Sequence, residues 1–433
     1  METRKRKVAF HTLGCKLNFA ETSAISRLFP EDQYERVPAN TRADIYIINT
    51  CSVTDSAERK CRQAVRKFIG MAPDAYIAVV GCYTQMRPQE LSAIPGVDLV
   101  LGTNERFSLT DYLSDTTGRF QTRVHSGELS DNDVFHPSFS IGDRTRSFLK
   151  VQDGCDYGCS YCTVPLARGR SRNPEIKSLV SDARKIAASG VKEIVVTGVN
   201  TGDFGKSTGE SFTSLLSELT GTAGIERLRI SSVEPNLLTD ELIDLTASNE
   251  KIMPHFHIPL QSGSDRVLGL MGRRYRSADF AGRVERIRKL MPFAGIGADI
   301  IVGFPGETAP YFEETYLFLR DLPLSYLHVF SFSARPGTRA EKLPGRVSDS
   351  EKTRRSRVLI SLSKTKQLEF NRMNLGRTTE VLFEQVRSDG MISGFTPNYI
   401  RAWHPWKSAL AGSIKQVRLK EITATGKVNV EII

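Results

Sequence analysis

Short apolar runs alternate with amphipathic segments along the first part of the chain. The runs are short enough to be buried strands, which are predicted at 8–13, 45–48, 76–80 and 99–101. Apolar residues at helical spacing follow them, and helices are predicted near 18–29, 55–70, 85–93 and 105–114. Because alternating strands and helices build a parallel sheet with helices on both faces, residues 1–115 are expected to form a doubly wound α/β domain.

A second strand–helix series follows a segment rich in Ser, Thr, Gly and Asp, which is interpreted as a linker over 116–140. Strands are predicted at 147–151, 193–197, 226–231, 256–259, 297–302 and 324–332. Helices are predicted at 176–189, 211–220, 239–247, 277–290 and 308–321. Six repeats over about 190 residues indicate a partial, TIM-like βα barrel, because a full eightfold barrel needs about 250 residues.

The pattern changes again toward the end of the chain. A charged helix is predicted near 348–375, and it closes a domain that spans 141–375. After this helix come short β-rich runs separated by turn residues, at 379–383, 416–419 and 427–432. Residues 376–433 are therefore expected to form a small all-β barrel.

The composition is that of an ordinary globular protein, with 40% hydrophobic and 25% charged residues among 433. A net charge of +10 favours a polyanionic partner such as nucleic acid. No run of 18 apolar residues is present, so no membrane partner is expected, and the basic start lacks the cleavage site of a signal peptide. We therefore expect a cytoplasmic location, where reducing conditions favour metal or redox use of the seven cysteines over disulfides.

Three cysteines, Cys15, Cys51 and Cys82, each follow a predicted strand of the first domain. The carboxyl ends of parallel strands lie on one edge of a sheet, so the three thiols are expected to meet there. Gly14 and Gly81 precede two of them, as expected where the backbone turns tightly. The alternative is three buried structural cysteines. Cys61, inside a predicted helix, breaks the pattern and is interpreted as an incidental thiol.

A second set, Cys155, Cys159 and Cys162, forms a CxxxCxxC run directly after the first strand of the second series. Three thiolates at this spacing can hold three corners of an iron–sulfur cube and leave the fourth iron open for a ligand. Zinc is the rival metal, but structural zinc takes four ligands, and no fourth Cys or His follows nearby. The run is thus typical of a radical S-adenosylmethionine enzyme.

These features together resemble the methylthiotransferase family of radical S-adenosylmethionine enzymes over essentially the whole chain. The resemblance lies in the two cysteine triplets in this order and in the runs Thr12 to Asn18, Asn49 to Thr54, Val80 to Cys82, Pro165 to Gly169, Arg229 to Pro235, Pro259 to Ser264 and Asp299 to Thr308. The last domain is similar to the small RNA-binding barrel of the family, the TRAM domain.

The resemblance implies two 4Fe–4S clusters and S-adenosylmethionine as cofactors. The catalytic cluster, on Cys155, Cys159 and Cys162, would generate a 5′-deoxyadenosyl radical, and the auxiliary cluster, on Cys15, Cys51 and Cys82, would deliver sulfur. Six further residues at strand ends or beside the ligands are candidate contacts for S-adenosylmethionine: Tyr161, Gly198, Asn200, Ser232, Gln261 and Ile301. The alternative for each polar one is a helix-capping role. His255 and His257 share one strand face and are interpreted as packed histidines.

Family members modify either tRNA or a ribosomal protein, and several features favour tRNA. The predicted helix at 55–70 and the segment 273–289 are rich in Lys and Arg. The last domain offers aromatic residues that could stack on loop bases: Phe395, Tyr399, Trp403 and Trp406. The alternatives are solvated charged faces and core aromatics.

Within the family, the runs Leu13 to Lys16 and Asn49 to Gln63 resemble the branch that acts on N6-threonylcarbamoyladenosine beside the anticodon. The implied product is the 2-methylthio derivative of that nucleoside. A flavodoxin- or ferredoxin-type electron donor and a sulfur donor are implied as further partners. The alternatives are a methylthiotransferase for isopentenyladenosine or for a ribosomal-protein aspartate, and a non-catalytic RNA-binding protein with structural metal.

Overall fold

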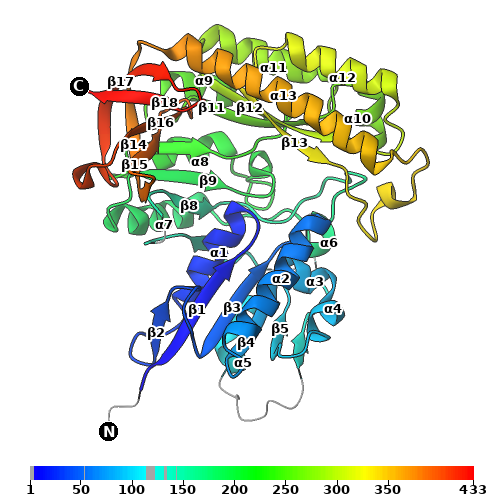
Figure 1. Ribbon diagram of the computed structural model, residues 1–433, viewed down its shortest axis with the longest axis vertical. Helices are drawn as coiled ribbons and strands as arrows, with labels where there is room; N and C mark the ends of the chain where they lie inside the picture. The colour runs from blue at the N-terminus through cyan, green and yellow to red at the C-terminus, as the bar shows by residue number, and fades with distance from the viewer. Residues whose placement is uncertain (1–3, 53, 114–121, 131–133, 143) are drawn as a thin grey trace.

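The computed structural model describes residues 4–52, 54–113, 122–130, 134–142 and 144–433. It consists of three parts: the first lies at the lower end of the molecule with the N-terminus, and the second and third lie side by side above it (Figure 1). In the described part of the chain, no helix is long and apolar enough to cross a bilayer.

The first part is a parallel six-stranded sheet in the order β2-β1-β3-β4-β5-β6. Its strands are β1 (Arg6–Thr12), β2 (Tyr34–Val37), β3 (Ile45–Thr50), β4 (Tyr76–Gly81), β5 (Leu99–Leu101) and β6 (Arg123–His125). Its helices are α1 (Lys16–Ser26), α2 (Asp55–Met71), α3 (Cys82–Met86), α4 (Pro88–Ser92), the 3₁₀ turn η1 (Glu105–Ser108) and α5 (Leu109–Leu113).

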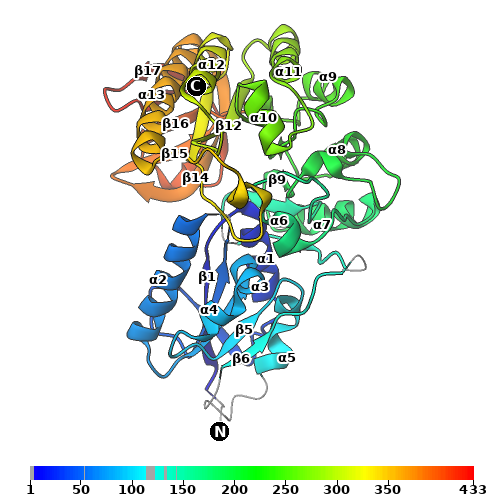
Figure 2. The same ribbon diagram turned by 90° about the vertical axis from the view of Figure 1, so that its right-hand side faces the viewer.

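Alternate residues of β3 enter two different cores. Tyr46 and Ile48 pack on one face of the sheet, and Ile45 and Ile47 pack on the other. Both faces are therefore covered by helices, which confirms the predicted doubly wound architecture. The carboxyl ends of the strands point toward the middle of the molecule (Figures 1 and 2).

The sequence pattern missed several details of this sheet. β2 and β6 are short edge strands without a clear apolar run, and β6 lies within the segment interpreted as a linker. The single helix predicted over 85–93 is divided into α3 and α4, because Pro88 cannot continue a helix and instead begins the next one.

The second part is a partial βα barrel. Its strands are β7 (Ser138–Phe139), β8 (Ser147–Lys150), β9 (Glu193–Thr197), β10 (Arg227–Ile230), β11 (His255–Gln261), β12 (Gly295–Val302) and β13 (Tyr326–Ser331). Its helices and 3₁₀ turns are α6 (Val164–Arg168), α7 (Ile176–Ala188), η2 (Thr201–Asp203), α8 (Phe212–Thr220), α9 (Asp240–Ser248), α10 (Asp265–Met271), α11 (Ser277–Leu290), α12 (Ala309–Asp321), η3 (Arg339–Lys342) and α13 (Asp349–Asn374).

The strands from β8 to β13 follow one another in sequence order, and β7 adds an antiparallel edge strand. Between β10 and β11 the regular ladder is reduced to isolated parallel bridges, one of which joins Ser232 and His257. One continuous hydrophobic core runs from β8 through α13. The partial barrel predicted from six βα repeats is therefore confirmed.

The third part is a closed five-stranded barrel in the order β14-β15-β16-β18-β17, as predicted for the end of the chain. Its elements are β14 (Thr378–Ser388), β15 (Met391–Phe395), β16 (Arg401–Pro405), the 3₁₀ turn η4 (Ser408–Leu410), β17 (Ile414–Ile422) and β18 (Val428–Ile432). It docks on the partial barrel through Arg229, whose guanidinium donates hydrogen bonds to the carbonyl oxygens of Thr396 (3.2 Å) and Pro397 (2.9 Å).

Candidate active site at the junction of the three parts

The structure brings the first cysteine set together, as the strand register predicts. Cys15 caps the start of α1 after β1, Cys51 follows β3, and Cys82 begins α3 directly after β4. All three line one cavity of about 750 Å³ at the carboxyl edge of the first sheet. Three thiols that converge on an open space form a donor set of the kind that holds an iron–sulfur cluster.

Gly14 and Gly81 make this convergence sterically possible. Their φ angles are +109° and +111°, in the region that favours glycine. A Cβ at Gly14 would lie 2.7 Å from Cβ of Cys51, and one at Gly81 would lie 2.4 Å from Oδ1 of Asn49. The backbone therefore approaches the neighbouring strand too closely for any side chain.

Cys61 does not belong to the set that lines the cavity. It is fully buried in the core under α2, and its thiol donates to the carbonyl oxygen of Cys51 at 3.6 Å. Burial raises the pKa of Cys61 to about 11, so it stays a neutral thiol at neutral pH. Its contact supports the loop that carries Cys51.

The second cysteine set lies in the loop between β8 and α6. Each sulfur receives one N–H donor: the Tyr157 amide at 3.4 Å for Cys155, the Arg273 guanidinium at 3.1 Å for Cys159, and the Val164 amide at 3.4 Å for Cys162. Such donors stabilise the negative charge of cluster-bound thiolates and tune their potential.

Burial opposes ionisation of the same thiols. It raises the pKa of Cys155 to about 11 and that of Cys162 to about 12. The free thiols are therefore protonated at neutral pH, and coordination to a metal ion is the interaction that deprotonates them. Half-buried thiols with aligned N–H donors fit a metal cluster better than they fit a structural core.

Arg273 is a site residue that sequence reasoning assigned to RNA binding. Its guanidinium also donates to the hydroxyl oxygens of Tyr161 (3.3 Å) and Tyr275 (3.0 Å), and it forms an ion pair with Glu234. The basic run alone gave no sign of this role, because Cys159, Tyr161 and Glu234 come from two other loops. The half-buried Arg283 and Arg286 pair with acids of α9, so this segment offers RNA fewer cations than the sequence indicated.

The candidate S-adenosylmethionine contacts divide between two adjoining cavities. Tyr161, Gln261 and Ile301 line a smaller cavity of about 280 Å³ together with Cys162. Gly198 and Ser232 line the larger cavity instead. The two cavities share Thr163 and Val164 in their walls.

Two of these residues carry unused hydrogen-bonding capacity. Asn200 lines neither cavity, but both polar atoms of its side chain are buried without a hydrogen-bond partner. Gln261 has a φ of +70°, which is rare for a residue with a side chain, and its buried Oε1 is also unpartnered. The orphaned Oε1 of Gln261, in the cavity that Cys162 lines, fits the binding of a polar cofactor.

A chain of polar side chains crosses the barrel mouth between the two cavities. Nδ1 of His257 lies 2.5 Å from Oγ of Ser232, and its Nε2 lies 2.9 Å from Oδ1 of Asp299. The same carboxylate oxygen lies 3.3 Å from Nδ1 of His328. Burial would raise the pKa of Asp299, but the hydrogen bonds from both histidines lower it well below its usual range. Sequence reasoning missed this network because its members lie on four strands.

His255, interpreted as a packed histidine, is buried and stacks on Tyr399 of the third part at a centroid distance of 4.2 Å. Tyr399 has a φ of +70° and lines the larger cavity. The third part thus contributes an aromatic wall to the cavity that holds the first cysteine set.

A buried ion network joins the first two parts behind the cavities. Glu21 of α1 accepts from Arg106 (2.7 Å), Arg168 (2.9 Å) and Lys150 (3.1 Å), and Arg168 also binds Asp153. Burial would raise the pKa of Glu21, but these three cations lower it to about 2. The network fixes α1, which begins beside Cys15, against the loop that carries the second set.

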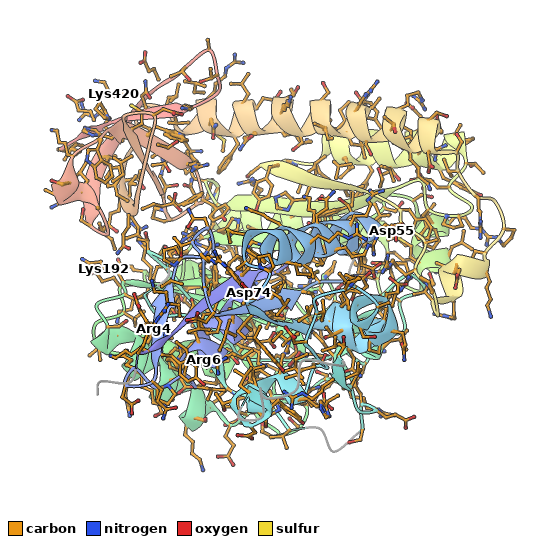
Figure 3. All side chains as sticks on the ribbon, turned by 60° about the horizontal axis from the view of Figure 1, so that its bottom comes forward. Arg4, Arg6, Asp55, Asp74, Lys192 and Lys420 are labelled. Atoms are coloured by element: carbon orange, nitrogen blue, oxygen red, sulfur yellow. The ribbon has the colours of Figure 1, made fainter. Side chains whose placement is uncertain are left out.

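A second clamp joins the far side of the first part to the partial barrel. Arg335 is buried and pairs with Asp55 and Glu58 of α2, and the Ser333 hydroxyl donates to Asp55 at 3.1 Å. Figure 3 shows Asp55 at the end of α2 that meets the chain beyond β13. The parts that carry the two cysteine sets are therefore joined by ion pairs at two separate places.

Some of the side chains that were predicted to contact RNA are exposed, whereas others are held by contacts within the protein. Arg59, Lys60, Arg66 and Lys67 of α2 are exposed, but Arg62 turns to the Tyr83 hydroxyl and Glu90. Trp403 is buried under cation–π contacts from Arg401 and Lys427.

Two family models match the chain. An uncharacterized protein family, UPF0004, matches residues 7–102, and the radical SAM superfamily matches residues 149–319. Threonylcarbamoyladenosine tRNA methylthiotransferase MtaB of Bacillus subtilis (strain 168) is 40% identical over 424 residues, which cover 95% of this chain and 93% of that protein. The tRNA-2-methylthio-N(6)-dimethylallyladenosine synthase of Syntrophus aciditrophicus (strain SB) is 34% identical over 394 residues, which cover 88% and 84%.

A solved structure with a similar fold is the radical S-adenosylmethionine methyltransferase TsrM of Kitasatospora setae, with cobalamin and a 4Fe-4S cluster bound. Its TM-score is 0.56 at 17% identity, with 78% of this chain and 77% of that chain covered. At this identity the likeness concerns the fold.

Proposed function

The chain belongs to the tRNA methylthiotransferases of the radical S-adenosylmethionine superfamily, and on that premise we propose that it converts N6-threonylcarbamoyladenosine in tRNA into its 2-methylthio derivative. The observation that carries the proposal is 40% identity to a threonylcarbamoyladenosine enzyme across 93% of that enzyme. The first cysteine set lines the larger cavity and Cys162 of the second set lines the adjoining one, which supports the proposal.

The six cysteines are the proposed ligands of two 4Fe–4S clusters, one on Cys15, Cys51 and Cys82 and one on Cys155, Cys159 and Cys162. When bound, the clusters and S-adenosylmethionine would supply the radical that removes hydrogen from C2 of the adenine ring and the sulfur and methyl group that replace it. The protein supplies binding, orientation and exclusion of water.

The chain's own residues have distinct proposed tasks. Arg273 and the amides of Tyr157 and Val164 hold charge at the sulfurs of the second set. Tyr161, Gln261 and Ile301 form the walls that would orient S-adenosylmethionine, with Gly198, Asn200 and Ser232 as further contacts. The larger cavity would receive the adenine base, with Tyr399 as a stacking surface.

The proposal includes partners beyond tRNA. Reduction of the second cluster needs an electron donor of the flavodoxin or ferredoxin type, and repeated turnover needs a sulfur donor. The third part of the chain, residues 376–433, is proposed as an RNA-binding domain. Because tRNA is a cytoplasmic substrate, the expected location is the cytoplasm.

Mass spectrometry of tRNA nucleosides tests the proposal. A strain without the gene should accumulate N6-threonylcarbamoyladenosine and lose its 2-methylthio form, and the wild-type gene should restore it. The second candidate substrate is the dimethylallyl (isopentenyl) nucleoside, which the name of the Syntrophus relative indicates. Loss of that methylthio nucleoside, with the threonylcarbamoyl form still methylthiolated, would overturn the proposal.

A further inference from the structure

The larger cavity has a one-sided distribution of charge. Five cations line it, whereas none of the described residues in its wall is an Asp or Glu; the cations are Lys16, Arg144, Arg146, Arg168 and Arg229. Fixed charges of one sign in a cavity raise the local concentration of the opposite charge. The cavity is therefore suited to an anionic ligand.

Three of the five cations already have anionic partners outside the cavity wall. Arg168 is bound by Glu21 and Asp153, and Arg229 is bound by Glu193 at 2.7 Å. Arg146 lies 3.7 Å from Glu384 and 3.9 Å from Glu193, and it stacks over Phe395. The charge of these residues is largely used to hold the parts of the protein together.

Lys16 and Arg144 differ from the other three. Among the residues that the structure describes, neither forms an ion pair, and both residues are exposed. The guanidinium carbon of Arg144 lies over two aromatic rings, 4.1 Å from the centroid of Phe19 and 5.8 Å from that of Phe148. A guanidinium supported in this way is pre-ordered, so a ligand loses less entropy when it binds.

The position of Lys16 relates this charge to the reaction. It directly follows Cys15 and lines the same wall as Cys51 and Cys82, beside the proposed site of sulfur delivery. The threonylcarbamoyl group is joined to the adenine through the amino group of threonine, which leaves a free carboxylate at its end. The isopentenyl group of the alternative substrate is uncharged.

We propose that Lys16 and Arg144 form a carboxylate-binding subsite that recognises the threonyl carboxylate of the substrate nucleoside. The inference rests on the proposed function and adds the residues that select between the two nucleosides. Hydrogen bonds from cations to a carboxylate are stronger than those between neutral groups, so loss of one partner weakens binding of the acid specifically.

A matched pair of RNA ligands separates this role from two others. The cations could instead balance the charge of a cluster on the first cysteine set or bind phosphates of the tRNA. Both of those roles are independent of the threonyl carboxylate. We therefore compare two anticodon stem-loops that differ only in whether this carboxylate is free or a neutral methyl ester.

The experiment uses the full chain with both clusters reconstituted anaerobically, and it measures Kd for each stem-loop by fluorescence anisotropy and KM for the acid. The wild type should bind the acid more tightly than the ester. Lys16→Gln should weaken binding of the acid about tenfold and leave the ester unchanged, and Arg144→Gln should do the same to a smaller extent. Lys16→Arg should keep most of the preference.

Lys177→Gln is the control for loss of one positive charge, because Lys177 is exposed and pairs with Glu175 away from the cavity. It should change the two affinities equally. Iron content and the electron paramagnetic resonance spectrum of each variant report whether Lys16→Gln disturbs the neighbouring cluster. If that variant loses iron, the ratio of acid to ester affinity in Arg144→Gln decides the question.

If Lys16→Gln keeps its full iron content and its ratio of acid to ester affinity equals that of the wild type, the proposed subsite is wrong. If Lys16→Gln loses iron, an unchanged ratio in Arg144→Gln leads to the same conclusion. The wild type would then still methylthiolate threonylcarbamoyl tRNA, so the proposed function would stand. If the wild type acts only on isopentenyl tRNA, both the function and the subsite are wrong.

Discussion

Each of the two cysteine sets presents three thiols, but the two sets are built in opposite ways. Cys155, Cys159 and Cys162 come from one short loop after β8. Cys15, Cys51 and Cys82 come from the ends of three separate strands, and only the folded sheet brings them together. The second set is therefore a local feature, whereas the first is a product of tertiary structure.

The two sets also differ in what surrounds their sulfurs. The second set has an N–H donor for every sulfur, including Arg273 from a distant loop. The first set opens on the larger cavity, whose wall carries five cations and an aromatic ring from the third part. Hydrogen bonds to the sulfurs of the second set suit a cluster that transfers electrons. The open, positively charged cavity beside the first set suits the binding of a substrate.

The junction between the two sets is the place where a single substitution should have the largest effect on stability. Arg168→Ala removes one of the two cations that link Glu21 to Asp153, the other being Lys150, and breaking a buried ion pair costs about 3–5 kcal/mol. Because α1 carries both Glu21 and the start of the first site, iron should be lost from that site first. Chemical denaturation and iron analysis measure both effects.

Arg184→Ala is the control for this variant, because Arg184 is exposed on α7. Its free energy of unfolding should stay within about 0.5 kcal/mol of the wild type. Equal stability of the two variants would show that the buried network does not hold the sets together.

A substitution that acts through backbone geometry alone should have a smaller effect on stability, and it should affect only the first of the two sites. Gly81→Ala places a Cβ within 2.4 Å of Asn49 and 2.7 Å of the Thr50 carbonyl oxygen, and it should cost about 2 kcal/mol and remove iron only from the first site. Gly190→Ala has a similar φ, +82°, but nothing within 4 Å of the new Cβ. It should cost about 1 kcal/mol and keep all iron. Equal loss of iron in both variants would contradict the crowding argument.

The smallest predicted effect concerns the second set. Arg273→Gln removes the donor to Cys159, which should lower the reduction potential of the second cluster by on the order of 60 mV if the hydrogen bond contributes about 1.4 kcal/mol. A redox titration followed by electron paramagnetic resonance measures this shift. Arg274→Gln is the control, since Arg274 stacks on Tyr157 instead. An equal shift of the reduction potential in both variants would show that the hydrogen bond from Arg273 to Cys159 has no specific effect.

The contrast between the sites also explains what the sequence could predict. The local spacing of Cys155, Cys159 and Cys162 is visible in the chain itself, and the convergence of Cys15, Cys51 and Cys82 follows from parallel strand order. Apolar periodicity located most strands of both α/β parts, but not the short edge strands β2, β6 and β7.

The remaining site features depend on pairings that no local pattern encodes. Arg273 reaches Cys159 from 114 positions away, and Asp299 meets His257 across 42 positions. Glu21 looks like an ordinary helix residue until three cations from other segments surround it. These contacts arise from the way the two α/β parts pack, so only the folded structure reveals them.

The central claim is that the two cysteine sets have separate tasks, and one paired assay tests it most directly. Cys51→Ala and Cys155→Ala are each incubated anaerobically with reductant, S-adenosylmethionine and threonylcarbamoyl tRNA, and 5′-deoxyadenosine and the methylthio nucleoside are quantified together. Each variant should lose about four iron atoms per chain. Cys51→Ala should still form 5′-deoxyadenosine without the methylthio product, and Cys155→Ala should form neither. Methylthio product from Cys51→Ala would contradict the account.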